Sequence, residues 1–208
     1  PASGDAGGAL GAALFAWHQI LKNPRTVNGK DDLQKGSLLG PSFTNDQVAE
    51  ALKGYNAKSH YHATEEALAE AVSQALADSK VVGLFNGRAE FGPRALGARS
   101  IIGDPRNPEM QKIMNLKIKF RESFRPFAPS VLREDVSDWF GLDYDSPYML
   151  LVDCVKIEKR CQMSDEKNAL FGIEKLNIKR SEIPAVTHVD YSARIQTVHK
   201  ETNPIYHA

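Results

Sequence analysis

Apolar side chains recur at helical spacing in three parts of the chain. Residues 9–22 place theirs near one stripe, which predicts a helix. A short helix is expected over 46–53, because Thr44 and Gln47 have the spacing of a capping box. The clearest helix is 64–79, where a threonine can act as the cap, two glutamates occupy the first turn and the apolar stripe is expected to be buried.

Strand signals alternate with these helices. The apolar runs 81–85 and 148–155 predict two buried strands, and 188–196 alternates between apolar and polar positions along its whole length. Another helix is expected to begin at 107–109, with asparagine as its cap and proline in the first helical position. Segment 156–183 is polar and weakly patterned, which indicates an excursion. These elements predict an α/β (α+β) fold in which helices flank a twisted mixed sheet.

Composition is that of an ordinary globular protein. The 208 residues are 42% hydrophobic and 25% charged, and 26 Lys and Arg balance 26 Asp and Glu. A net charge of zero gives no global argument for a nucleic-acid partner, and no apolar run is long enough to span a bilayer. Two cysteines do not make a disulfide framework, so a cytoplasmic location is expected. Because the chain has no initiator methionine, we expect it to be a piece of a longer protein.

Positive charge is concentrated in one segment of this neutral chain. Residues 88–133 contain ten Lys or Arg and four Asp or Glu, whereas the remainder contains sixteen and twenty-two. Arg88 and Arg94 lie in a loop that also carries three glycines, which allow a ligand to approach the backbone closely. The alternative is that these arginines form ordinary salt bridges with Glu90 and Asp104. We favour a site for a phosphorylated small molecule.

A second basic group follows within the same segment. Lys119 and Arg121 are expected to project to one side of an extended stretch, with Arg125 and Ser130 close behind. Phenylalanines interleaved with these residues can anchor the backbone and exclude water, which strengthens contact with an anion. The alternative is a basic edge strand kept soluble by its lysines.

The polar face of the alternating segment 188–196 is the third candidate. It carries side chains that can donate, accept and titrate, and it includes His188 and Arg194 as candidate ligand-binding residues. The alternative is a plain solvated strand face.

Three blocks of sequence closely resemble a known family. They read GRAEFGPRALGARSIIGDPR from residue 87, NLKIKFRESFRPFAPSVL from residue 115 and PAVTHVDYSARIQTV from residue 184. They are similar to the C-terminal region of the O-carbamoyltransferases of the nodulation and antibiotic-tailoring type, which join a Kae1-like (ASKHA) domain to a YrdC-like domain. The resemblance implies three parts: a remnant of the Kae1-like domain with its terminal helix (1–22), a linker (23–56) and a C-terminally truncated YrdC-like domain (57–208).

The resemblance also implies a reaction. The YrdC-like domain would use ATP and carbamoyl phosphate to make carbamoyl-adenylate, and the Kae1-like domain of the same protein would transfer the carbamoyl group to a hydroxyl of a small-molecule acceptor. ATP would bring magnesium, and a second divalent metal, iron, would assist the transfer. The basic motif expected to hold carbamoyl phosphate and the nucleotide comprises Lys119, Arg121 and Arg125, with help from Arg88 and Arg94.

The first residues resemble the last motif of the Kae1-like domain. There Asp5 would be a metal ligand, and Gly7 and Gly8 would pack near the nucleotide. The family's histidine ligands belong to the part of the protein that precedes this chain, so activity is expected of the parent enzyme rather than of the fragment alone.

Three other functions remain open at this point. The chain could be a nucleic-acid-binding module, although its basic residues are compactly placed and the rest of the chain is acidic. It could make threonylcarbamoyl-adenylate for tRNA modification, although the quoted blocks match the carbamoyltransferases better. It could also be a regulatory fragment with a decayed site, against which the intact set of Arg and Lys argues.

Overall fold

The computed structural model describes residues 2, 4–27, 29, 32–176 and 178–208. The helices are α1 (Asp5–Phe15), α2 (Asn45–Gly54), α3 (Glu65–Ala77), α4 (Met110–Ile113), α5 (Val136–Trp139), α6 (Asp165–Asn168), α7 (Ile173–Leu176) and α8 (Pro204–His207). The strands are β1 (Val82–Phe85), β2 (Arg99–Ile102), β3 (Ser130–Leu132), β4 (Leu151–Cys154) and β5 (Ser192–Val198). Single π-helical turns extend α1 over Ala16–Ile20 and α4 over Met114–Ile118.

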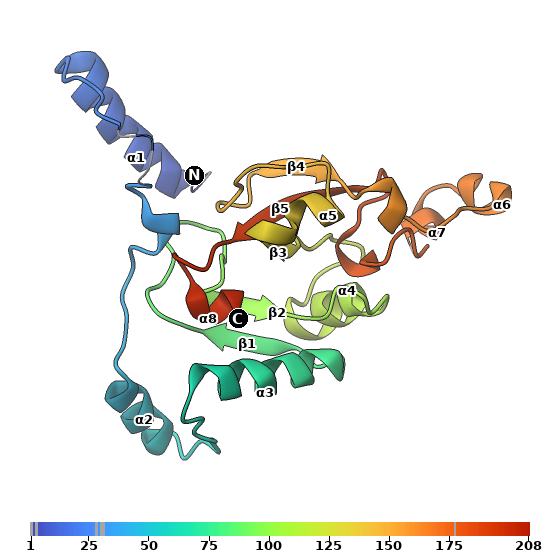
Figure 1. Ribbon diagram of the computed structural model, residues 1–208, viewed down its shortest axis with the longest axis horizontal. Coiled ribbons are helices and arrows are strands. Elements are labelled where there is room, and N and C mark those ends of the chain that lie inside the picture. Colours follow the sequence, from blue (N-terminus) through green and yellow to red (C-terminus); the bar gives the residue numbers. More distant parts are fainter. Residues whose placement is uncertain (1, 3, 28, 30–31, 177) are drawn as a thin grey trace.

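The strands form two small sheets rather than the single twisted sheet expected from the sequence. Strands β1 and β2 pair antiparallel, with Val82 opposite Ile102. In the other sheet the central strand β5 runs parallel to β3 and antiparallel to β4. Figure 1 shows the two sheets at different levels, with α3 beside β1 on the outer side of the smaller sheet. The α+β class is confirmed, whereas the YrdC-like identity of the domain stays a prediction.

The core of the larger sheet lies between β5 and the segment around α5. It consists of Val136, Phe140, Leu142, Val155, Ile183, Val186, Ala193 and Ile195. A smaller cluster joins Met110, Met114 and Ala185. The ring of Phe127 packs against both clusters, so one side chain links the α4 region to the larger sheet.

Local helix signals were read correctly. The Thr44 hydroxyl accepts from the backbone N–H of Gln47, and the Gln47 side chain accepts from the backbone N–H of Thr44, which completes the predicted capping box of α2. The Thr64 hydroxyl caps α3 in the same way through the N–H of Ala67. The helix predicted over 9–22 is confirmed and begins earlier, at Asp5.

Burial was predicted less well. Helix α3 has no buried residue. The expectation of a buried stripe on it is wrong, because its main contact is with β1 of the small two-stranded sheet. The run 148–155 was expected to be buried, but β4 is an edge strand and most of it is exposed. Helix α4 begins at Met110 rather than at 107–109, and the side chain of Asn107 accepts the N–H of Glu109 in the turn ahead of the helix.

The alternating segment differs most from its prediction. Residues 188–191 form a turn, closed where Tyr191 N–H donates to the carbonyl of His188, and the strand begins at Ser192. Because β5 is the central strand, nearly all of it is buried on both faces. Its apolar–polar alternation therefore does not separate an inner face from a solvated one.

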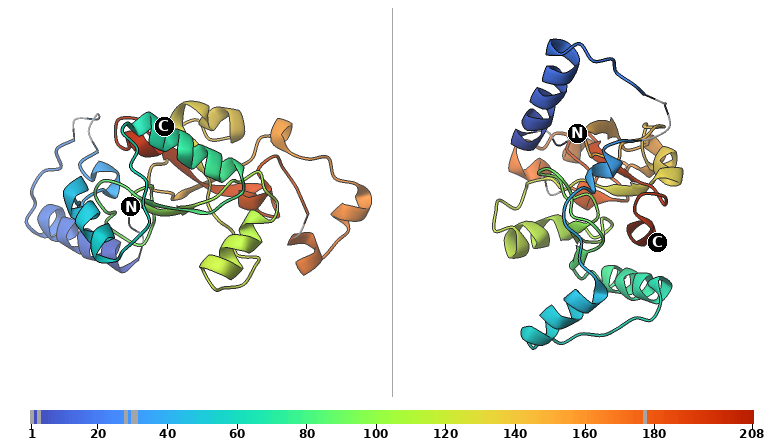
Figure 2. Two further views of the ribbon diagram at one scale, coloured as in Figure 1. Left: turned by 90° about the horizontal axis from the view of Figure 1, so that it is seen from below. Right: turned by 90° about the vertical axis from the view of Figure 1, so that its left-hand side faces the viewer.

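The two ends of the molecule extend away from the sheets. Helix α1 projects at one end, and α6 with α7 forms the excursion at the other, as Figures 1 and 2 show. No helix in the described ranges is long and apolar enough to cross a membrane.

Candidate functional site

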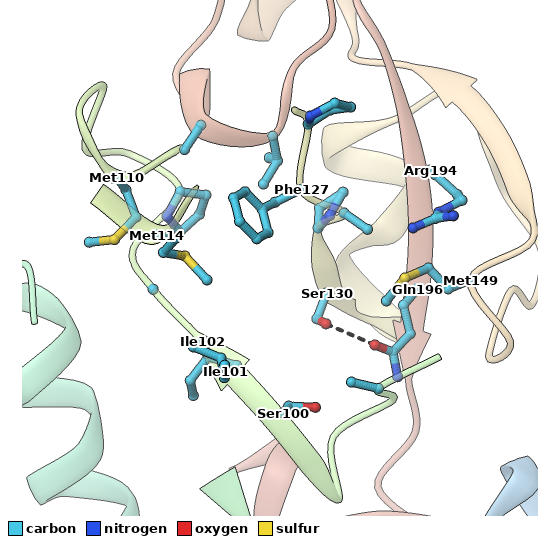
Figure 3. Close-up of a pocket in the computed structure, with 18 of the residues that line it drawn as sticks. Ser100, Ile101, Ile102, Met110, Met114, Phe127, Ser130, Met149, Arg194 and Gln196 are labelled. Atoms are coloured by element: carbon cyan, nitrogen blue, oxygen red, sulfur yellow. Dashed lines mark hydrogen bonds between the residues drawn. The ribbon is translucent and has the colours of Figure 1, made fainter. Parts of the chain in front are cut away.

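A cavity of about 560 Å³ lies between the two sheets, bounded by β2 on one side and by β3 and β5 on the other. Figure 3 shows Ser130, Arg194 and Gln196 across the space from Ser100 and Ile101. Four cationic side chains line the cavity, and none of the described residues that line it is acidic. These cations are Arg94, Lys119, Arg121 and Arg194. We call this space the basic cavity.

Arg121 is held in the basic cavity by a buried asparagine. Its Nε donates to Oδ1 of Asn115 at 2.6 Å, and its guanidinium carbon lies 4.9 Å from the centroid of the Phe127 ring. Asn115 has no exposed surface, and its Nδ2 donates to the carbonyls of Ser123 and Arg125 at 3.0 and 2.8 Å. One amide thus closes the loop and orients the arginine. The only sequence signal for Asn115 was its place at the start of the second block.

The chain from Lys119 to Arg125 is a loop and not the extended stretch expected. The π-turn ends at Ile118, and Phe120 has a φ of 49°, which reverses the backbone direction. Lys119 and Arg121 nevertheless both line the cavity. Phe120 was expected to anchor this segment but is 84% exposed. Arg125 lies outside the cavity lining, exposed and paired with Glu122 at 2.9 Å.

The Arg/Gly loop is folded by the carboxylate of Glu90. Its Oε1 accepts the backbone N–H groups of Leu96, Ala98 and Arg99 at 2.7, 2.8 and 3.2 Å. The loop is thereby turned back on itself, with Arg94 at the cavity wall. In the alternative interpretation, Asp104 would pair with an arginine of this loop. It pairs instead with Arg106, which holds the pKa of the Asp104 carboxyl below its usual value.

Arg88 contacts the linker instead of lining the cavity. Its Nη2 donates to the carbonyl of Leu39 at 3.1 Å, and the side chain is exposed. Backbone bonds reinforce this contact, since Gly40 N–H donates to the carbonyl of Ala89 at 2.8 Å and Ala89 N–H donates to that of Pro41 at 2.9 Å. The Arg/Gly loop therefore has one arginine on the linker and another at the cavity.

Arg194 and His188 were expected on one strand face, and the structure separates them. Arg194 lines the cavity, where burial lowers its pKa and the charge of Arg94 lowers it further. Two guanidinium groups that stay protonated and repel each other favour an anion between them. His188 lies in the turn before β5, outside the cavity lining, with Nδ1 3.2 Å from the Ser192 hydroxyl. Burial lowers the pKa of the His188 imidazole.

Comparison with known proteins identifies the family of this chain. The family described as Carbamoyltransferase C-terminus matches residues 73–208. The chain belongs to this family. Every residue of the basic cavity lies inside the matched range. The resemblance predicted from the three sequence blocks is thereby confirmed.

Several curated relatives align with almost the whole chain. An uncharacterised protein of Synechocystis sp. is 61% identical over 100% of the chain, which covers 34% of that protein. The nodulation protein NolO of Bradyrhizobium diazoefficiens is 36% identical over 99% of the chain and 34% of its own length. The 3'-hydroxymethylcephem-O-carbamoyltransferase of Amycolatopsis lactamdurans is 31% identical over 100% of the chain and 32% of its own length. The chain spans about a third of the length of these relatives.

The carbamoyltransferase C-terminus carries a hydrogen-bonded series of side chains at one wall of the basic cavity. The hydroxyl of Ser130 lies 2.9 Å from Oε1 of Gln196, and the Tyr206 hydroxyl lies 2.7 Å from that of Ser130. The Nε2 of Gln196 donates to the carbonyl of Leu96 at 2.8 Å. Ser130 was a sequence candidate, whereas Tyr206 was missed because it lies in a short terminal segment with no pattern of its own.

Asp5, the predicted metal ligand, and Gly7 and Gly8, predicted to pack near the nucleotide, belong to α1. Gly7 and Gly8 are on α1, outside the cavity lining, and the side chain of Asp5 is outside the described part of the structure. Among the described residues no group of three or more His, Cys, Asp or Glu could hold a metal ion.

Proposed function

We propose that this chain is part of an O-carbamoyltransferase and that its basic cavity binds carbamoyl phosphate together with the phosphates of ATP. Carbamoyl phosphate, ATP and water would give carbamoyl-adenylate, pyrophosphate and phosphate. The carbamoyl group would then pass to a hydroxyl of a small-molecule acceptor, and AMP would leave. The observation that carries the proposal is the convergence of four cations, from three separate segments, on a cavity with no acidic residue among the described residues that line it. Membership of the carbamoyltransferase family supports the class of reaction.

The cavity's chemistry suits adenylate formation. Two anionic reactants must approach each other, so the main requirement on the protein is to neutralise and align their phosphates. Arg94, Arg121 and Arg194 can each present a planar fork to phosphate oxygens, and Lys119 adds a mobile point charge. A volume of about 560 Å³ lies within the range of small-molecule sites. No protein nucleophile is needed for this step.

The proposal assigns the metal to the neighbouring Kae1-like domain. The described residues include no group of three or more His, Cys, Asp or Glu that could hold a metal ion, so we do not assign iron a role in the cavity. Magnesium would accompany ATP as its usual counter-ion. The cytoplasm, where ATP is available, is the proposed location.

The α1 helix supports a neighbouring domain as partner. Its extension exposes large apolar side chains, of which Phe15 is 61%, Trp17 53% and Ile20 65% exposed. Several large apolar side chains exposed on one short helix are typical of an interface. We propose that the Kae1-like domain of the same protein covers it.

Replacement of Arg121 tests the proposed step in the complete enzyme. Arg121→Ala should abolish carbamoyl-phosphate-dependent exchange between ATP and pyrophosphate, because a lost buried phosphate contact costs about 2–5 kcal/mol. Arg121→Lys should restore it only in part, since a point charge does not reproduce the fork. Labelled pyrophosphate incorporation into ATP measures the rate.

Arg133→Ala is the matched control, because Arg133 pairs with Asp145 and lies outside the cavity lining. Its exchange rate should equal that of the unaltered enzyme. If Arg121→Ala retains exchange but loses carbamoyl transfer to the acceptor, the cavity serves the acceptor and the proposal is wrong.

A further inference from the structure

The series of side chains at the wall of the basic cavity has a fixed hydrogen-bond direction. The carbonyl of Leu96 can only accept, so the group 2.8 Å from it must be the amide nitrogen of Gln196. The amide oxygen of Gln196 then faces Ser130, and the Ser130 hydroxyl must donate to it (Figure 3). Because that hydroxyl has a single hydrogen, Tyr206 must donate its own hydrogen to the Ser130 oxygen.

This direction determines what the wall can offer to a ligand. Both hydroxyl hydrogens are used within the series, so Ser130 and Tyr206 present only oxygen lone pairs to the cavity they line. Gln196 also borders the cavity but is only 4% exposed, and its amide oxygen and nitrogen are both used within the series. Burial raises the pKa of the Tyr206 phenol, which keeps its hydrogen in place. Phosphate oxygens are hydrogen-bond acceptors, so the oxygen lone pairs of Ser130 and Tyr206 would repel them. An N–H group of a ligand could instead donate a hydrogen bond to these oxygens.

The phenol ring is held firmly enough to serve as a recognition element. Gly97 has a φ of +104°, and a side-chain carbon placed on it would collide with Cδ1 of Tyr206. The ring therefore packs directly on the backbone of the Arg/Gly loop. The same loop supplies the Leu96 carbonyl that sets the direction of the series.

We propose that Ser130 and Tyr206 form an amide-recognising wall of the cavity and accept hydrogen bonds from the NH2 of a carbamoyl group. Gln196 is the positioning residue that turns the Ser130 hydroxyl away from the ligand. The inference rests on the proposed function and adds to it the means of selecting carbamoyl phosphate over other acyl phosphates. The four cations hold the phosphate and do not discriminate between acyl groups.

Acetyl phosphate provides the test, because it replaces the NH2 of carbamoyl phosphate with a methyl group. Calorimetric titration of the complete enzyme should show carbamoyl phosphate bound about tenfold more tightly, which is the value of one hydrogen bond. In Tyr206→Phe and Ser130→Ala the ratio of the affinity for carbamoyl phosphate to that for acetyl phosphate should fall toward one. The affinity for acetyl phosphate itself should change less than about twofold. Ser130→Thr keeps the hydroxyl and should restore the ratio.

The outcomes separate this inference from the proposed function. If the unaltered enzyme binds neither acyl phosphate, the proposed function fails; if it binds both equally, only the amide-recognising wall fails. Equal loss of both ligands in the isosteric variant Tyr206→Phe would assign the series a structural role and overturn the inference. Adenine also carries an NH2 group, so ATP and GTP are compared in the same variants. The inference would also be overturned if these variants lost their preference for ATP over GTP but kept their preference for carbamoyl phosphate over acetyl phosphate.

Discussion

Each polar atom of the Asn115 side chain takes part in a hydrogen bond although the residue has no exposed surface. Two of these bonds close the 119–125 loop, and the third fixes Nε of Arg121. The guanidinium of Arg121 is thereby oriented by a buried side chain outside the loop. Pre-orientation of this kind lowers the entropic cost of binding an anion.

Replacement of this residue should affect both stability and binding. Asn115→Ala removes the Nδ2 donor to the carbonyls of Ser123 and Arg125 and the acceptor of the Arg121 Nε–H, so the free energy of unfolding should fall by about 1–3 kcal/mol. Urea unfolding measures the fall, and phosphate titration should show weaker binding. Lys117→Ala, an exposed change on the same turn, is the control. Unchanged stability in Asn115→Ala would show that the loop is held by other contacts.

At the scale of elements, the Arg/Gly loop depends on a single carboxylate oxygen. Glu90 gathers three N–H groups at the start of β2, and the linker pairs with the opposite side of the loop through Ala89. A glycine-bearing loop has a high conformational entropy when unfolded, so such an internal bond network is needed to hold Arg94 at the cavity.

Removal of that carboxylate should loosen the loop. Glu90→Ala should lower the free energy of unfolding by about 1.5–3 kcal/mol, the range for bonds to a charged group. Glu90→Gln should cost less, because the amide oxygen can still accept from the backbone. Thermal unfolding followed by circular dichroism measures both variants. Glu109→Ala, which alters an exposed glutamate, should leave the unfolding transition unchanged. An equal loss of stability in this control would show that the loss in Glu90→Ala is not specific to the loop.

For the whole molecule, the position of the cavity depends on the larger sheet and its turn. Phe127 packs on both apolar clusters, and β5 brings Arg194 to the wall opposite β2. The turn that precedes β5 contains the half-buried His188, whose pKa is lowered by burial, raised by Asp190 and lowered by Arg194. Proton uptake at this histidine therefore links solution pH to the stability of the fold.

Stability should decrease as the pH falls below 6.5. The pKa of His188 is depressed in the folded protein, so the unfolded chain takes up the proton first. The stabilising contribution of neutral His188 is complete above 6.5, the ordinary pKa of histidine, and is lost as the pH falls through the lower pKa of the folded protein. Urea unfolding between pH 7.5 and about 5 should show this slope. His188→Asn should flatten it, and His60→Asn, at an exposed position, should not. An unchanged slope in His188→Asn would contradict the assignment.

Local sequence predicted the starts of α2 and α3 well, because their causes lie within a few residues. The capping box of α2 joins Thr44 to Gln47, and the cap of α3 joins Thr64 to Ala67. Burial depends on distant partners, and the predictions for α3 and β4 failed on that account. The family could also be identified from the sequence, because the resemblance extends over three long blocks of residues.

The sequence by itself determined which residue types could bind a phosphorylated ligand, and it placed most of them in one basic segment. Only the tertiary structure decided which of them meet. Arg94 and Arg194 are one hundred residues apart and share a cavity, whereas Arg88 contacts the linker and Arg125 pairs with Glu122. The pairing of β3 with β5 brings Ser130 opposite Gln196. Such contacts arise from packing between distant segments, and a local pattern along the chain carries no information about them.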